Sequence, residues 1–173
     1  MPGDAHELTF CCYKKRPFLT NENARSYLID SLNASRVRYH FDIWAWVFMP
    51  EHVHILIYPL DELYSISSIL RSIKQPMAGR MIWHLKKFDL DSLKFLETGL
   101  TKPKYRFWQD GGGYDRNYCS TNEIRKQIDY IHNNPVRRGL VKEPCEWELS
   151  SAKDWIKGEA GKIVIDRESV PMI

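Results

Sequence analysis

The sequence predicts an α+β fold, in which helices flank one central and mostly antiparallel sheet. Short segments rich in β-branched and aromatic residues are typical of strands, and longer segments between them have the spacing of amphipathic helices. A two-residue turn joins two of the strand segments, and strands joined so closely pair antiparallel. The elements are expected in the order strand, helix, strand, strand, helix, strand, helix.

The N-terminal half contains the predicted hairpin. Residues 7–13 alternate between two faces and predict the first strand, and residues 21–35 have helical spacing. Residues 39–49 are rich in aromatic and β-branched side chains and predict the second strand. A turn at residues 50–51 leads into a third strand over residues 52–58, so these two strands should form an antiparallel hairpin.

The middle of the chain predicts a long helix followed by a loop. Residues 65–88 have apolar side chains at helical spacing, and Pro76 within them predicts a kink or a break. Residues 89–104 are polar and rich in turn formers, which is typical of a mobile loop. Residues 105–109 predict a short strand ahead of a glycine hinge at residues 111–113.

The C-terminal part begins with a predicted helix over residues 121–133, which Pro135 ends. Residues 143–173 hold four basic and seven acidic side chains, so their net charge of −3 leaves +6 on residues 1–142. A basic body suggests a polyanionic partner. We therefore divide the chain into a functional domain, residues 1–142, and an acidic C-terminal extension. The extension either covers a basic groove or packs on the domain, and its apolar content favours packing.

Length and composition exclude several classes of protein. With 173 residues, of which 43% are hydrophobic and 27% charged, the chain is expected to be one folded domain and not a disordered segment. No run approaches the ~20 apolar residues of a membrane span, and the first seven residues lack the apolar core of a secretory signal. The four cysteines form no CxxC pair, so we expect reduced thiols, a cytoplasmic location and no membrane partner.

The most specific feature is the pair His52 and His54. Side chains two residues apart on a strand point to the same face, about 6–7 Å apart along the strand, which allows both imidazoles to bind one metal ion. The residues between and after them, Val53 and Ile55, would then point into the core. The alternative is that two surface histidines simply alternate on a half-exposed strand.

A second feature is the pair Tyr130 and Asn134, which share one helical face one turn apart. Ile124, Ile128 and Ile131 form a separate stripe, which leaves Tyr130 exposed. A tyrosine hydroxyl can attack phosphorus and form a covalent phosphotyrosine. Two histidines and the Asn134 amide oxygen would suit Mg²⁺ or Mn²⁺, which polarises a phosphate. The alternative is a packing tyrosine with no chemical role.

Basic and aromatic side chains are interleaved in three segments, residues 63–88, 102–108 and 136–142. Such groups suit phosphate contacts and base stacking in single-stranded nucleic acid, although each run alone is also typical of a solvated surface. The side chains predicted to contact nucleic acid in these segments are Arg71, Lys74, Arg80, Lys104, Arg106, Trp108, Arg137 and Arg138.

Two motifs together resemble a known family. Residues 49–57, Met-Pro-Glu-His-Val-His-Ile-Leu-Ile, resemble the MPNHVHLLI motif of single-tyrosine HUH transposases. Residues 130–141, Tyr-Ile-His-Asn-Asn-Pro-Val-Arg-Arg-Gly-Leu-Val, resemble the YIHNNPVRAGLV signature of the REP-associated tyrosine transposases. The similarity spans roughly residues 7–155 and includes Arg116, which joins the predicted DNA contacts. Glu51 departs from the pattern, because the family usually has Asn there.

The resemblance implies a ferredoxin-like, or RRM-like, core. It also implies roles: Tyr130 attacks a scissile phosphate and becomes linked to the DNA 5′ end, and His52, His54 and Asn134 bind Mg²⁺ or Mn²⁺. The implied function is a metal-dependent endonuclease and strand transferase that cleaves single-stranded DNA next to hairpins of palindromic repeats, with a monomer favoured over a homodimer. The alternative is a domesticated relative that binds hairpin DNA or RNA without cutting it.

Overall fold

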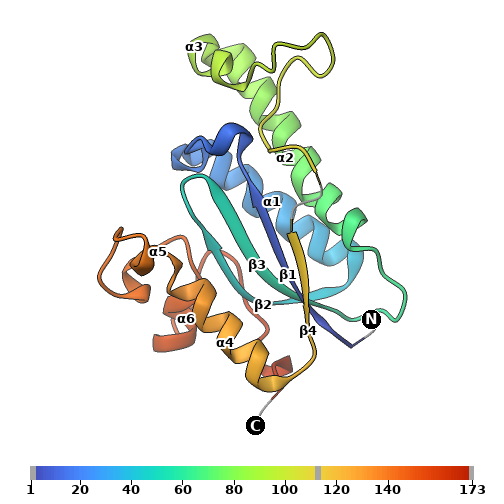
Figure 1. Ribbon diagram of the computed structural model, residues 1–173, viewed down its shortest axis with the longest axis vertical. Helices are drawn as coiled ribbons and strands as arrows, with labels where there is room; N and C mark the ends of the chain where they lie inside the picture. Colours follow the sequence, from blue (N-terminus) through green and yellow to red (C-terminus); the bar gives the residue numbers. More distant parts are fainter. Residues whose placement is uncertain (1–2, 112–113, 172–173) are drawn as a thin grey trace.

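The computed structural model describes residues 3–111 and 114–171, and its centre is a four-stranded antiparallel sheet (Figure 1). The strands lie in the order β2-β3-β1-β4, and every neighbouring pair is antiparallel. Together with the two long helices they follow the β-α-β-β-α-β order of a ferredoxin-like fold, as the sequence predicts. The elements of this core are β1 (Ala5–Cys11), α1 (Glu22–Tyr39), β2 (Phe41–Phe48), β3 (His52–Pro59), α2 (Ile66–Phe88) and β4 (Tyr114–Tyr118).

Helices cover both faces of the sheet. The long helices α1 and α2 lie on one face, and α4 lies on the other with α5 and α6 near it (Figure 1). Within the described residues, no helix is both long enough and apolar enough to cross a membrane. The remaining helical elements are α3 (Leu90–Leu93), α4 (Thr121–His132), α5 (Asn134–Arg137), α6 (Ala152–Lys157) and the 3-10 turns η1 (Tyr13–Lys15), η2 (Phe18–Thr20), η3 (Lys94–Leu96), η4 (Pro144–Glu146) and η5 (Arg167–Ser169).

Each face of the sheet has its own apolar core, because successive side chains of a strand point to opposite faces. On β3, Val53, Ile55 and Ile57 pack toward α1 and α2, whereas Leu56 packs toward α4. All four side chains are fully buried. The strand that carries the two histidines is therefore held from both sides, which fixes the direction of its side chains.

The predicted hairpin and first helix are confirmed. Strands β2 and β3 pair antiparallel across the turn at residues 50–51, with Phe48 opposite Val53. Helix α1 begins after Asn21, whose side chain accepts a hydrogen bond from the Ala24 backbone N–H at 3.1 Å. An asparagine in this position satisfies one of the free amides at the start of a helix.

Of the kink or break predicted at Pro76, the break is wrong, because α2 continues through Pro76. The predicted loop over residues 89–104 is only partly right. It contains α3 and η3, and these bury Leu93 and Leu96 against the core that contains α2. Apolar side chains at a spacing of three make a short helical turn that the surrounding polar residues conceal in the sequence.

The fourth strand is residues 114–118 and not 105–109 as predicted. Phe107 and Trp108 are both buried in the same core, so the segment lacks the alternation of a strand and forms only isolated bridges. Strand β4 instead pairs with residues 5–9 of β1. Its sequence is mostly polar and lacks the apolar alternation by which a strand is predicted. Of the predicted glycine hinge, Gly112 and Gly113 lie outside the described residues.

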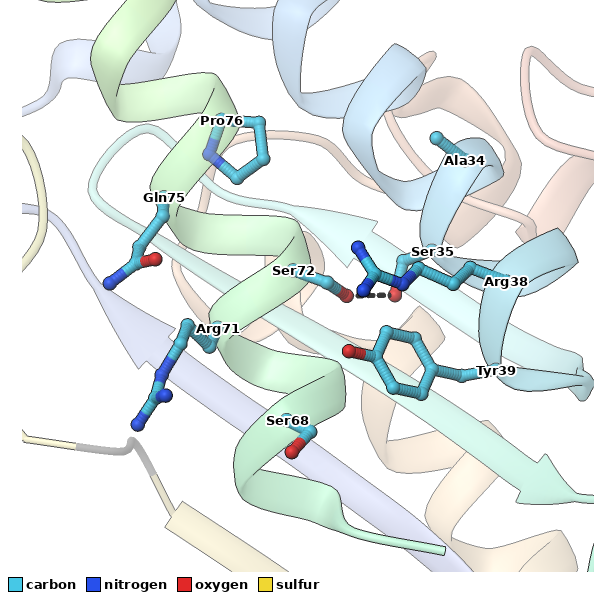
Figure 2. Close-up of a pocket in the computed structure, with 9 residues that line it drawn as sticks. All are labelled: Ala34, Ser35, Arg38, Tyr39, Ser68, Arg71, Ser72, Gln75 and Pro76. Carbon is cyan, nitrogen blue, oxygen red and sulfur yellow. Dashed lines mark hydrogen bonds between the residues drawn. The ribbon is translucent and has the colours of Figure 1, made fainter.

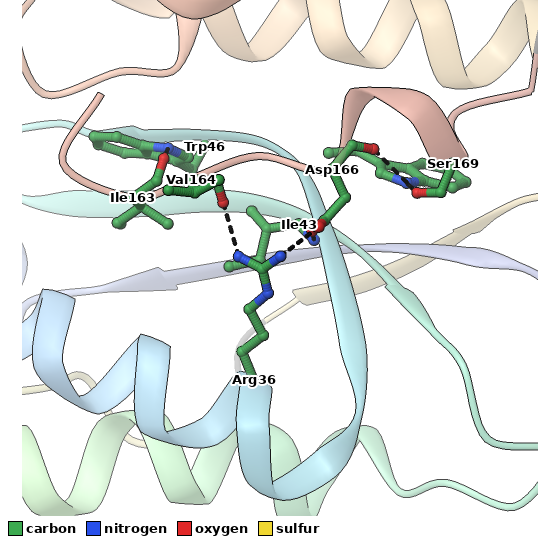
Figure 3. A network of polar contacts seen from close by, with 8 residues as sticks. Arg36, Ile43, Trp46, Ile163, Val164, Asp166 and Ser169 are labelled. Carbon is green, nitrogen blue, oxygen red and sulfur yellow. Dashed lines mark hydrogen bonds and ion pairs between the residues drawn. The ribbon is translucent and has the colours of Figure 1, made fainter. Parts of the chain in front are cut away.

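The C-terminal segment covers the edge of the sheet (Figure 3). The Asp166 carboxylate accepts a hydrogen bond from the Ile43 N–H of β2 at 2.8 Å and pairs with Arg36 of α1. The Trp46 indole donates to the Ile163 carbonyl at 3.3 Å. Strand β2 is an edge strand, and an uncovered edge is prone to pair with other chains. The acidic segment therefore packs on the sheet and α1.

Burial of His132 at the end of α4 predicts a pH-dependent stability. Its Nε2 lies 2.9 Å from the Ser151 hydroxyl, and burial lowers its pKa from 6.5 to about 4. Between these values the unfolded chain binds a proton that the folded chain excludes, so stability falls as the pH falls. Between pH 6.5 and pH 5 we expect His132 to lower the free energy of unfolding by about 2 kcal/mol, because each pH unit in this range contributes about 1.36 kcal/mol.

Urea unfolding of the protein and of His132→Gln at pH 7, 6 and 5 measures this contribution. The difference between the two proteins removes the contribution of all other titrating groups. Parallel pH dependences in the two proteins would contradict the prediction.

Candidate functional site

The site lies where β1, β3 and the end of α4 meet. Strands β1 and β3 pair with Thr9 opposite His54 and Cys11 opposite His52. Directly opposite residues of an antiparallel pair point to the same face. The two imidazole rings accordingly lie side by side, with their centroids 4.9 Å apart. The shared face predicted for the two histidines is confirmed.

Carboxylates orient both histidine rings. His54 Nδ1 lies 2.9 Å from Glu7 Oε1, and His52 Nδ1 lies 3.0 Å from Glu51 Oε1. A carboxylate oxygen accepts a hydrogen bond from a ring N–H, so these contacts suit the tautomer in which Nδ1 carries the proton and Nε2 keeps its lone pair. The Thr9 hydroxyl also lies 2.9 Å from His54 Nδ1. Neither Nε2 has a hydrogen-bond partner among the residues that the structure describes. Two nitrogen ligands are thus presented in the form that binds a metal ion.

Burial is the main influence on the protonation of His52. Burial and the neighbouring His54 lower the pKa of His52 below its ordinary value. Burial alone would raise the pKa of Glu51, but hydrogen bonds from Arg138 and His52 outweigh it and hold the pKa below its ordinary value. The Arg138 guanidinium donates to Glu51 Oε1 at 2.7 Å. A neutral imidazole beside an ionised carboxylate is the arrangement found at metal-binding histidines.

Helix α4 presents Tyr130 to this face. The helix begins at a Ser120 cap, and Ile124, Ile128 and Ile131 are buried against the sheet. Tyr130 is off this stripe and 40% exposed, as the helical spacing predicts. Its ring centroid lies 5.8 Å from that of His54, and the Arg137 guanidinium lies 4.8 Å from the same ring. The tyrosine hydroxyl is therefore accessible beside the histidine pair and a positive charge.

Two buried amide nitrogens, one on α4 and one on α5, lack a hydrogen-bond partner among the described residues. Gln127 Nε2 and Asn134 Nδ2 are buried and have no hydrogen bond within the described part of the chain. A buried polar atom without a partner costs about 1–3 kcal/mol, and such atoms concentrate at functional sites. Rotating the Asn134 amide by 180° exchanges its oxygen and nitrogen. The buried position can therefore hold the amide oxygen, which is the atom that binds a metal ion.

The ligand chemistry around the histidines favours a mixed set of nitrogen and oxygen atoms. Within residues 3–111 and 114–171, no three His, Cys, Asp or Glu side chains gather into a metal-binding group. A third protein ligand could be an amide, a hydroxyl or a backbone carbonyl. The buried Asn134 amide has this chemistry, and its role as the third ligand stays a prediction. Such a set suits Mg²⁺ or Mn²⁺ better than a structural Zn²⁺ site.

A hollow of about 670 Å³ opens over the histidine pair, and we call it the histidine hollow. Its wall carries the positive charges of Lys15 and Arg138. Cations at the rim of an open hollow favour the binding of phosphate groups. The residues that line it are Thr9, Cys11, Lys15, Pro17, Glu51, His52, His54 and Arg138.

The predicted DNA contacts on α2 lie elsewhere. Arg71 borders a separate hollow of about 430 Å³ between α1 and α2, where it extends from α2 while Arg38 extends from α1 (Figure 2). Lys74 donates to the Gly111 carbonyl at 2.8 Å, and Arg80 pairs with Asp30 at 2.8 Å. These three side chains belong to the helical layer on the face opposite α4.

The other predicted contacts differ in exposure. Trp108 is buried and its indole donates to the Lys74 carbonyl at 3.1 Å, so little of its ring remains free for stacking. Arg106 pairs with Asp110 at 2.7 Å, and the Lys104 ammonium lies 5.3 Å from the Tyr105 ring. Arg116 lies on β4, with its guanidinium 5.3 Å from the Tyr118 ring. Only Arg137 and Arg138 adjoin the tyrosine and histidine groups directly.

Sequence reasoning missed Glu7 and Tyr118. The Glu7 carboxylate is buried, contacts His54 with one oxygen and accepts a hydrogen bond from the Tyr118 hydroxyl at 3.1 Å with the other. The Tyr118 hydroxyl is also 2.8 Å from Gln127 Oε1 of α4. These contacts link β1, β3, β4 and the tyrosine helix. An acid within a predicted strand, beside the apolar Leu8, is the one signal for Glu7 in the sequence.

Comparison with known protein families decides the assignment. The family model described as "Transposase IS200 like" matches residues 5–134, which include both histidines and Tyr130. The chain belongs to the IS200-like transposase family. This transposase is also similar to a candidate REP-associated tyrosine transposase of Haemophilus influenzae, at 26% identity over 80% of this chain and 78% of the relative.

A REP-associated tyrosine transposase of Escherichia coli is 30% identical over 115 residues, which cover 64% of this chain and 54% of that protein. Among solved structures, a REP-associated tyrosine transposase bound to a REP hairpin superposes with a TM-score of 0.67. It is 23% identical and covers 100% of this chain and 94% of that one. This similarity establishes a shared fold, and the resemblance expected from the two sequence motifs is confirmed.

Proposed function

We propose that this transposase is a metal-dependent nuclease and strand transferase that cleaves single-stranded DNA next to a hairpin, with Tyr130 as the nucleophile. The observation that carries the proposal is the exposed Tyr130 ring at 5.8 Å from a histidine ring whose Nε2 is free to bind a metal ion. Three similar proteins support a DNA partner. Two relatives are named as REP-associated tyrosine transposases, and a solved structure of the same fold holds a REP hairpin.

The proposed reaction is a transesterification at phosphorus. The Tyr130 hydroxyl oxygen forms a bond to the phosphorus of a phosphodiester, and the bond from phosphorus to O3′ breaks. Tyr130 loses its phenolic proton, and the departing O3′ gains one to become a 3′ hydroxyl. The 5′ phosphate of the downstream DNA fragment remains linked to Tyr130, and the upstream fragment is released with a free 3′ hydroxyl. Attack by a free 3′ hydroxyl on this linkage releases the tyrosine and joins the strands. No oxidant or reductant is needed, because one phosphodiester replaces another at each step.

The residues present fit a divalent cation. His52 and His54 would bind it through Nε2, and the Asn134 amide would supply the oxygen ligand. When bound, Mg²⁺ or Mn²⁺ would act as a Lewis acid on the phosphate oxygens. Arg137 over the Tyr130 ring and Arg138 at the hollow would hold the phosphate beside the tyrosine.

The proposal is tested by a covalent adduct assay. Labelled oligonucleotides that form hairpins with single-stranded flanks, taken from DNA around the gene, are incubated with the protein and Mg²⁺ or Mn²⁺ and separated on a denaturing gel. We expect a shifted band that a chelator prevents. Tight binding in a native gel without any adduct would favour the domesticated binding protein instead.

Glu7 offers a second prediction for the same site. Because its carboxylate holds the Nδ1 proton of His54, a Glu7→Gln variant removes an acceptor that carries charge and lets the ring adopt the other tautomer. We expect Mn²⁺ affinity, measured by calorimetry, and adduct yield to fall by about 10- to 100-fold. Glu97→Gln, an exposed acid of the segment after η3, is the matched control. Unchanged Mn²⁺ affinity in Glu7→Gln would contradict this role.

A further inference from the structure

The end of α2 and the turns that follow it form an exposed aromatic surface. We call residues 83–96 the arm, because α3 and the end of α2 extend beyond the sheet at the top of Figure 1. Trp83 is 59% exposed and Phe88 is 62% exposed, and their ring centroids lie 6.3 Å apart. Leu90 and Phe95 are also more than half exposed. Large apolar side chains grouped on a surface mark an interaction site.

Positive charge surrounds these rings. The Lys87 ammonium lies 5.1 Å from the centroids of both Trp83 and Phe88. Lys86 and Lys104 lie 5.2 Å and 5.3 Å from the Tyr105 ring. Among the residues that the structure describes, these three lysines form no ion pair.

The acids of the arm have other partners. Asp89 caps α3 by accepting a hydrogen bond from the Ser92 N–H at 3.0 Å, and Asp91 pairs with Lys94 at 2.7 Å. Neither acid therefore forms an ion pair with Lys86 or Lys87. A ligand that matches this surface carries regular negative charge and flat, apolar faces.

Single-stranded nucleic acid has this chemistry. Its phosphates pair with lysines and its unpaired bases stack on exposed aromatic rings, whereas a duplex hides its base faces. A protein partner would leave the lysines unmatched unless it were strongly acidic. We propose that the arm binds single-stranded DNA by stacking bases on Trp83 and Phe88. The inference rests on the proposed DNA function and adds a second contact surface to it.

The arm is continuous with the histidine hollow. Lys15 lines the hollow, and the next residue, Arg16, places its guanidinium 5.0 Å from the Phe95 ring of the arm. Arg16 also donates to the Phe95 carbonyl at 3.2 Å. Two adjacent cations thus lie between the histidine hollow and Phe95, at one edge of the arm, where they can contact the phosphates of a DNA strand that reaches both surfaces.

Fluorescence anisotropy with a labelled 20-nucleotide dT strand tests the proposal. We expect a Trp83→Ala/Phe88→Ala double variant to bind about 10- to 100-fold more weakly, because each stacked base contributes strongly. A Lys86→Ala/Lys87→Ala variant should reduce the salt slope of log K by about 1.4, which corresponds to two phosphates of a single strand. The control, Ile156→Ala/Lys157→Ala on α6, changes an equally exposed apolar and basic pair on the other face of the sheet and should bind normally.

Trp83 also gives a direct spectroscopic signal. Of the six tryptophans, Trp44, Trp46 and Trp108 are buried and Trp147 and Trp155 are half-buried, so Trp83 is the one that solvent reaches most freely. Binding of dT should quench its fluorescence. Trp83→Phe should keep most of the affinity and lose this quenching, which a purely structural role would not produce.

The outcomes separate this proposal from the nuclease proposal. Weaker dT binding by the arm variants, with no adduct from the unaltered protein, keeps the arm and overturns the nuclease. Normal dT binding by the arm variants, with adducts formed, keeps the nuclease and overturns the arm. Equal weakening of binding to a blunt 20-base-pair duplex, or a change of oligomeric state in place of DNA affinity, also overturns the arm.

Discussion

A Tyr130→Phe variant is expected to form no covalent adduct with a hairpin oligonucleotide under any condition in which the unaltered protein forms one. Phenylalanine keeps the ring beside His54 and under Arg137 but removes the only atom proposed to bond to phosphorus. The loss should be complete, because no neighbouring group replaces a nucleophile that becomes part of the product.

The same variant should bind the hairpin as tightly as the unaltered protein. Tyr130 is 40% exposed and no hydrogen bond joins its hydroxyl to another described residue, so its removal costs little stability. Native gels with the same oligonucleotides measure this affinity. Binding without adduct separates the chemical step from recognition of the DNA.

Tyr39→Phe is the matched control for this experiment. Tyr39 ends α1 on the opposite face of the sheet, where its ring borders the hollow between α1 and α2 (Figure 2). It should form adducts at the normal level. An adduct that persists in Tyr130→Phe and disappears in another tyrosine variant would assign the nucleophile to that other residue.

The site residues that could be predicted from the sequence are those whose pattern lies within a single strand or helix. His52 and His54 follow the period of a strand, and Tyr130 departs from the isoleucine stripe of its helix. Each of these patterns lies within one element, where geometry follows directly from spacing. The hairpin between β2 and β3 is local for the same reason, because its two strands are joined by a turn of adjacent residues.

The residues that were missed depend on contacts distant in the sequence. Glu7 meets Tyr118 across 111 positions, because β4 pairs with β1 at the far side of the sheet. Strand β4 has too little apolar alternation to be recognised alone, and its pairing partner is not encoded nearby. Trp108 is predicted to be exposed because it is an aromatic residue among basic ones. In the structure its ring is buried in the core.

Removal of residues 143–173 is expected to unfold the protein, even though charge alone suggests a separable extension. Backbone hydrogen bonds join this segment to edge strand β2 along its length, including Asp166 N–H to the Ile43 carbonyl at 2.9 Å and Ser151 N–H to the Trp46 carbonyl at 3.0 Å. A chain that ends at Lys142 would expose this edge and the apolar rings beneath the segment. Such an edge pairs with other chains, so we expect aggregation and loss of the cooperative unfolding transition.

A single substitution tests the same contact more gently. Asp166→Ala removes the ion-pair partner of Arg36, which keeps its hydrogen bond to the Val164 carbonyl, and it leaves the Ile43 N–H without its acceptor (Figure 3). We expect a loss of about 2 kcal/mol in urea unfolding, with an exposed acid of the same segment, Glu168→Ala, as the unaffected control. A segment that merely covered a basic groove would behave differently. The shortened chain would then remain folded, and its adduct yield on hairpin DNA would rise above that of the full chain.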